Sequence, residues 1–82
     1  MARVELLGKP ECHLCDDARA VVARVCGELG VEWNERDLTG EPGELARWWD
    51  NIPVTLVDGE VHNFWRVDEA RLRTALTRRA AG

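Results

Sequence analysis

The pattern of apolar and polar residues changes along this chain. Short segments typical of strands are followed by longer segments in which apolar residues recur at helical spacing. Arg3 to Leu7 is mostly apolar, which predicts a central strand with both faces covered. From about His13 to Leu29 apolar residues recur at helical spacing, and Gly30 provides a helix end. The apolar stripe comprises Cys15, Ala18, Val22, Val25, Cys26 and Leu29. We expect this stripe to face the core.

The second half of the chain predicts shorter elements. In Val31 to Asp37 apolar residues alternate with polar ones, which indicates a second strand at the edge of a sheet. Pro42 fits the first position of a short helix that reaches Trp48 or Trp49. Pro53 to Val57 predicts a third strand. Asp58-Gly59 is typical of a tight hairpin turn into a fourth strand, Val61 to Phe64.

A last helix is predicted after Asp68, whose side chain is suited to cap it. Helical spacing predicts an inward set, Leu72, Ala75 and Leu76, and an outward set, Arg71, Arg73 and Arg78. The expected order is therefore β-α-β-α-β-β-α. A right-handed crossover through the first helix makes the first two strands parallel, and the hairpin makes the last two antiparallel.

Composition and charge narrow the classes of partner. The chain has 82 residues, of which 45% are hydrophobic and 32% are charged, as in globular domains. The formal net charge of −4 argues against nucleic acid, whose phosphates require basic surfaces. The longest apolar run is far shorter than the roughly 20 residues that span a membrane. We expect a single domain over residues 1–82, a monomer with neither nucleic acid nor membrane as partner.

Cys12 and Cys15 form a C-x-x-C motif where the first strand gives way to the helix. A thiol in the first turn of a helix lies near unpaired N–H groups and the positive end of the helix dipole, which favour the thiolate. Cys15 lies about one turn further along the same face and can attack a mixed disulfide on Cys12. A protonated His13 would favour the thiolate further, whereas Asp16 and Asp17 would oppose it. The motif therefore predicts a dithiol for disulfide exchange.

Two other readings of the motif remain open. A zinc site needs further ligands, for which the chain offers Cys26, His13 and His62 without a second matching spacing. A structural disulfide is the other reading, but three cysteines without a signal peptide point to a reducing compartment, the cytoplasm. Cys26 lies about 16 Å from Cys15 along the helix axis, so we expect it to be a small core residue.

The chain resembles the glutaredoxin-like proteins of the thioredoxin superfamily. The resemblance is carried by the order of elements, by Cys12-His13-Leu14-Cys15 after the first strand and by Ile52-Pro53 before the third. It implies an α/β, minimal thioredoxin-like fold with a four-stranded mixed sheet and helices on both faces. It also implies an oxidoreductase in which Cys12 attacks and Cys15 resolves. The alternative is a non-catalytic thiol-bearing module that binds a partner or a metal through the same face.

The resemblance extends to the substrate site. It implies a cis peptide bond before Pro53, and a backbone at Ile52 that pairs with an extended peptide or a thiol cofactor. Lys9, the single lysine, and His13 complete the implied substrate-binding set. The implied substrate is a protein disulfide or a mixed disulfide. Asp68 is either an acidic partner for a ligand or only the helix cap.

The resemblance leaves the reductant open. Glutathione, another low-molecular-weight thiol and thioredoxin reductase are all compatible with it, and no tightly bound cofactor or metal is expected. Where glutathione-binding glutaredoxins usually carry Gly-Gly and an aspartate, this chain has the segment from Asn63 to Asp68.

Two tryptophans close the short second helix. Helical phase predicts Trp48 inward with Leu45, and Trp49 more exposed. One of them is expected near the dithiol as an apolar wall of the substrate groove, or both only cover the sheet.

Overall fold

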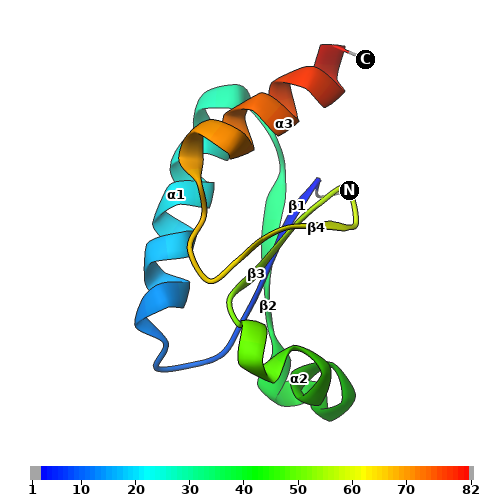
Figure 1. Cartoon of the computed structure of the whole chain (residues 1–82). Helices are drawn as coiled ribbons and strands as arrows, with labels where there is room; N and C mark the ends of the chain where they lie inside the picture. The colour runs from blue at the N-terminus through cyan, green and yellow to red at the C-terminus, as the bar shows by residue number, and fades with distance from the viewer. Residues whose placement is uncertain (1–2, 82) are drawn as a thin grey trace.

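The observed elements follow the predicted order. A computed structural model describes residues 3–81 (Figure 1). The elements are β1 (Val4–Gly8), α1 (His13–Leu29), β2 (Trp33–Asp37), η1 (Leu38–Gly40), α2 (Pro42–Trp48), η2 (Trp49–Asn51), β3 (Val54–Val57), β4 (Glu60–Phe64) and α3 (Glu69–Ala81). The strands shift by one or two residues from the predicted limits, and η1 and η2 are single 3-10 turns on either side of α2.

The four strands form one mixed sheet in the order β2-β1-β3-β4. β1 is parallel to β2 and antiparallel to β3, and β3 and β4 form an antiparallel hairpin. The predicted central β1, edge β2 and hairpin are therefore confirmed. On the edge strand, Arg36 pairs with Glu5 at 3.0 Å and with Glu41 at 2.8 Å, so its charge is satisfied by neighbouring side chains.

Helices cover both faces of the sheet, as expected. α1 and α3 lie side by side on one face, and α2 lies across the sheet from them (Figure 1). The core under α1 and α3 is built from Val4, Val22, Val25, Cys26, Val57, Leu72 and Leu76. A second cluster lies toward α2 and is built from Leu7, Cys15, Leu38, Ile52 and Val54. Val4 and Leu7 of β1 are three residues apart, so they lie on opposite faces of the sheet and belong to different clusters.

The core stripe of α1 ends one turn earlier than predicted. Cys26 is 1% exposed, which confirms it as a core residue, and burial raises the pKa of its thiol. Leu29 was predicted to face the core, and this is wrong, because it is 39% exposed. The Cys26 carbonyl accepts the N–H groups of Gly30 and Val31, so the chain already turns back toward the sheet there. The last turn of α1 therefore extends past the core.

α3 begins at the predicted cap. The Arg71 N–H donates to Asp68 Oδ1 at 3.0 Å, which is the hydrogen bond of an N-cap residue. Of the inward set, Leu72 and Leu76 are fully buried. Within residues 3–81, no helix combines the length and the apolar character needed to cross a membrane.

Candidate functional site

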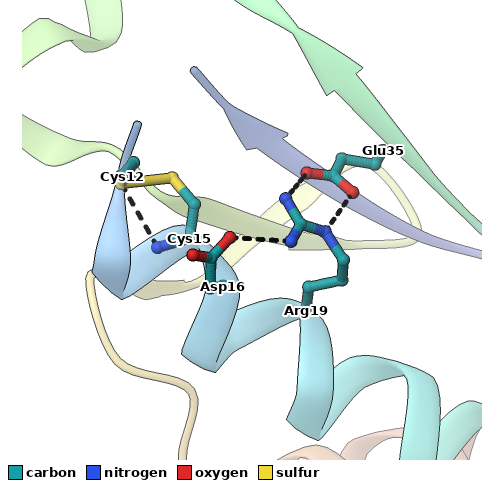
Figure 2. A network of polar contacts seen from close by, with 5 residues as sticks. All are labelled: Cys12, Cys15, Asp16, Arg19 and Glu35. Carbon is teal, nitrogen blue, oxygen red and sulfur yellow. Dashed lines mark hydrogen bonds and ion pairs between the residues drawn. A yellow bond between two sulfur atoms is a disulfide. The ribbon is translucent and has the colours of Figure 1, made fainter. Parts of the chain in front are cut away.

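Cys12 is the N-cap residue of α1 and its sulfur performs the capping. Its backbone is extended, with φ −121° and ψ 107°, and the Cys15 N–H donates to Cys12 Sγ at 3.2 Å. The two cysteines are joined as a disulfide with their Cα atoms 5.2 Å apart (Figure 2). The C-x-x-C spacing therefore places both sulfurs at the start of one helix, as the sequence predicts.

The two sulfurs differ in burial. Cys12 is partly exposed, whereas Cys15 is 0% exposed and packs with Leu7 and Val54. Gly8, the last residue of β1, leaves the space that Cys15 occupies: a Cβ at this glycine would lie 3.2 Å from Cys15 Sγ. Only Cys12 is accessible to a large partner.

A charged network lies beside the dithiol. Arg19 donates to both carboxylate oxygens of Glu35 at 2.7 Å and to Asp16 Oδ1 at 2.8 Å (Figure 2). Hydrogen bonds to the carboxylate of Glu35 first, and then to that of Asp16, raise the pKa of the Arg19 guanidinium above its usual value. The negative charge of Asp16, which opposes a nearby thiolate, is therefore offset by a fixed positive charge.

Sequence reasoning missed this network. Asp16 and Arg19 are three residues apart on a helix, which is a signal for an ion pair. The contact with Glu35 needs the parallel register of β2, in which Glu35 lies beside Leu6 of β1.

The peptide bond between Ile52 and Pro53 is cis, as the resemblance implied. Ile52 is 7% exposed and packs in the same cluster as Cys15, while Cys12 borders that cluster. The Pro53 carbonyl accepts the Trp65 N–H at 2.7 Å. The structure therefore brings Ile52 and Pro53 together with the dithiol, although about forty residues separate them in the chain.

Lys9 and His13 lie on either side of Cys12 in the chain. Lys9 Nζ is 4.0 Å from the centroid of the Trp49 ring, so this amine contacts an aromatic face. His13 is the first residue of α1 and is exposed. A part for either residue in binding a substrate stays a prediction.

The tryptophans are arranged as helical phase predicted. Trp48 is half-buried and packs with Leu45 against the cluster that contains Cys15, while Trp49 is 54% exposed. Of the two rings, Trp48 is therefore the one that packs against the cluster containing Cys15.

Further metal ligands do not gather around the cysteines. Within residues 3–81, no group of three or more His, Cys, Asp or Glu side chains is placed to hold a metal ion. His62 lies on β4, where burial first, and then Arg71, lowers the pKa of its imidazole.

The geometry agrees with the comparison to protein families. The family model described as Glutaredoxin-like domain (DUF836) matches residues 3–77. The chain belongs to this family. Among curated relatives, Uncharacterized protein Rv0508 of Mycobacterium tuberculosis is 38% identical, over 98% of this chain and 88% of the relative. Uncharacterized protein Mb0520 of Mycobacterium bovis matches with the same identity and coverage.

Solved structures show the same fold. The target protein XcR50 from X. campestris superimposes with a TM-score of 0.74 at 22% identity, covering 92% of this chain and 96% of that one. Thioredoxin 1 from Thermosipho africanus does so with a TM-score of 0.68 at 13% identity, covering 95% and 93%. The glutaredoxin-like protein therefore has the minimal thioredoxin-like fold, with a cysteine pair at disulfide distance at the start of α1.

Proposed function

We propose that this protein is a thiol–disulfide oxidoreductase that exchanges disulfides through Cys12 and Cys15. The observation that carries the proposal is the asymmetry of the pair. Cys12 Sγ is accessible and accepts an N–H of the first helical turn at 3.2 Å, whereas Cys15 is 0% exposed. A sulfur in that position is favoured as a thiolate, which is the attacking form. Cys12 is accordingly the nucleophile and Cys15 the resolving thiol.

The reaction transfers two electrons to the substrate disulfide. The Cys12 thiolate attacks one substrate sulfur, the substrate S–S bond breaks, and the other substrate sulfur leaves as a thiolate. Cys15 then loses its proton to that leaving thiolate and attacks Cys12 Sγ. The second substrate thiolate is released and takes a proton from water. The protein ends with the Cys12–Cys15 disulfide.

An external reductant returns the pair to the dithiol. Two molecules of a thiol such as glutathione supply two electrons and end as their own disulfide, and thioredoxin reductase with NADPH is the other class of reductant. A dithiol that works in its reduced form needs a reducing compartment, so we place the protein in the cytoplasm.

The substrate is proposed to bind beside the cis peptide bond. An extended polypeptide or the cysteine part of a thiol cofactor pairs with the backbone of Ile52, next to Pro53. Lys9 and His13 contact it at the mouth of the site. The substrate is a protein disulfide or a mixed disulfide.

A reduction assay tests this function. A protein disulfide is incubated with glutathione, and separately with thioredoxin reductase and NADPH, with and without the protein. Acceleration by the wild type, its loss in Cys12→Ser, and trapped mixed disulfides in Cys15→Ser are expected. Cys26→Ala should behave as the wild type. A wild type that accelerates neither reaction would indicate a non-catalytic module.

A further inference from the structure

Exposed aromatic side chains gather where β4 ends. Phe64 and Trp65 are exposed, the half-buried Trp48 contacts Phe64, and the exposed Trp49 follows Trp48 in the chain. We call these four residues the aromatic patch. The Trp48 and Phe64 ring centroids are 6.4 Å apart, and those of Phe64 and Trp65 are 5.9 Å apart. Trp49 and Trp65 are 54% and 49% exposed. Such side chains gain most from burial, so a continuous exposed set indicates a contact surface.

Trp65 is held in an unfavourable backbone conformation. Its φ is 59°, in the left-handed region that bulky side chains rarely adopt. Two hydrogen bonds fix it there: its backbone N–H donates to the Pro53 carbonyl at 2.7 Å, and its indole N–H donates to the Asp50 carbonyl at 3.0 Å. This conformation keeps the ring at the surface, next to the cis proline. Strain maintained in this way is typical of functional positions.

The aromatic patch is continuous with the dithiol site. Trp48 packs against the cluster that contains Cys15 and Ile52, and Cys12 borders the same cluster. A polypeptide that is attached to Cys12 and pairs with the backbone at Ile52 would continue onto the patch. Oxidised glutathione, built from γ-Glu-Cys-Gly, has no large apolar side chain to pack on the exposed rings.

Two cations lie on the rings of the patch. Lys9 Nζ is 4.0 Å from the Trp49 ring centroid, and Arg47 Cζ is 4.7 Å from the Trp48 ring centroid. Among the described residues neither forms an ion pair, whereas Arg19 and Arg36 each bind two carboxylates. One carboxylate of this chain already lies at the patch, because the Trp48 indole N–H donates to Glu44 Oε2 at 2.9 Å. The charge that complements Lys9 and Arg47 is a carboxylate on the partner.

We propose that the aromatic patch selects extended polypeptide substrates with a large apolar side chain and a carboxylate beside the disulfide cysteine. Trp65 is the specificity-determining residue. This inference rests on the proposed exchange reaction at Cys12 and names its substrate class. The apolar side chain packs on the exposed rings, and the carboxylate meets Lys9 or Arg47.

Single-turnover reduction of peptide disulfides by the pre-reduced protein tests the inference. The first peptide carries Phe and Glu beside its cysteine, the second has Ser for Phe, and the third has Lys for Glu. The wild type should reduce the first about tenfold faster than the second, because burial of one ring is worth at least that factor. The third should be slower than the first at low salt and approach it at high salt.

Substitutions at Trp65 test whether its ring provides the selectivity. Trp65→Gly removes the ring and fits the positive φ, so it should fold and lose most of the Phe-over-Ser preference. Trp65→Phe should keep most of that preference. Val61→Ser changes another exposed side chain of β4, outside the patch, and should leave it unchanged. Oxidised glutathione should react with Val61→Ser within about twofold of the wild type, as expected for a surface change away from its contacts.

The outcomes separate the two proposals. If oxidised glutathione and all peptides fail to react with the wild type, the exchange function is wrong. If exchange occurs but the preference is absent in the wild type or survives in Trp65→Gly, the patch does not select substrates. Equal rates for the Glu and Lys peptides at low salt would exclude the carboxylate contact.

Discussion

At the scale of single residues, the site depends on a capping sulfur and a glycine. N-caps are usually Ser, Thr, Asp or Asn, and here Cys12 Sγ accepts the Cys15 N–H in their place. In the proposed mechanism this hydrogen bond favours the Cys12 thiolate. Gly8 has no side chain where Cys15 Sγ packs against the end of β1. The position of the Cys15 sulfur consequently depends on the absence of a methyl group at Gly8.

A methyl group at Gly8 should disturb the resolving step. In Gly8→Ala the new Cβ would lie 3.2 Å from Cys15 Sγ, closer than most such contacts, so the sulfur must shift. Overpacking of this kind costs about 1–3 kcal/mol. We expect lower stability in urea unfolding, and mixed disulfides on Cys12 that persist longer in quenched reactions analysed by mass spectrometry.

A second glycine provides the control. Gly27 lies on the exposed side of α1 with nothing within 4 Å of a Cβ. Gly27→Ala should stabilise the protein by about 0.5–1 kcal/mol, because alanine favours the helix. It should not change the rate at which Cys15 resolves the mixed disulfide on Cys12. If Cys15 resolves the mixed disulfide at the wild-type rate in Gly8→Ala, the Cys15 sulfur tolerates displacement.

At the scale of elements, ion pairs join α1 to α3. Arg24 of α1 pairs with Glu69 of α3 at 2.5 Å, and Arg73 of α3 pairs with Glu28 of α1 at 2.7 Å. Arg73 also reaches Glu69 at 3.1 Å. Hydrogen bonds from Arg24 first, and then from Arg73, lower the pKa of Glu69 from 4.5 to about 2.

The Glu69 network predicts a loss of stability in acid. Because the pKa of Glu69 is lower in the folded state, its contribution is complete above pH 4.5 and is lost as the pH falls toward about 2. The free energy of unfolding, measured in urea between pH 6 and pH 2.5, should therefore decrease less steeply in Glu69→Gln than in the wild type. High salt should reduce the difference, since the pair is exposed. Identical slopes at low salt would contradict the role of Glu69.

The elements themselves could largely be predicted from the sequence. Apolar spacing placed α1 and its core face correctly from Cys15 to Cys26, because periodicity reports which side of a helix is buried. The prediction failed at Leu29, because the helical spacing of apolar residues continues past the point where the core ends. Short motifs also predicted the Asp58-Gly59 turn and the helix cap at Asp68 correctly.

The site was only partly predictable. Cys12 and Cys15 are close in sequence, and the cis bond before Pro53 was implied by resemblance. The salt bridge between Arg19 and Glu35 depends on strand register, and the left-handed φ of Trp65 depends on bonds to distant carbonyls. Neither feature can be predicted from the residues that are close to it in sequence.

At the scale of the whole molecule, the fold brings α2 and the start of β3 to the first turn of α1. Trp48 at the end of α2 packs against the cluster that Cys12 borders, across more than thirty residues of chain. Trp49 is 54% exposed, and Lys9 Nζ lies 4.0 Å from the centroid of its ring. Of these two neighbouring indoles, Trp48 is the one packed against the cluster that contains Cys15.

Tryptophan emission should follow the redox state through Trp48. A disulfide in contact with an indole quenches its emission, so reduction with dithiothreitol should increase the fluorescence of the wild type. Trp48→Phe should lose most of this increase, and Trp49→Phe, the matched control, should keep most of it. An undiminished increase in Trp48→Phe would show that this ring is too far from the dithiol to sense it.

The central claim, that a capping Cys12 is the activated nucleophile, is tested most directly by alkylation of the fully reduced protein. Iodoacetamide is added in small excess at several pH values, and each cysteine is followed by peptide mass spectrometry. Cys12 should react first, already at mildly acidic pH, because thiolate fraction and exposure both favour it. Cys15 and Cys26, which are 0% and 1% exposed, should react only slowly. Faster labelling of Cys15 than of Cys12, or labelling of Cys12 only at alkaline pH, would contradict the proposed mechanism.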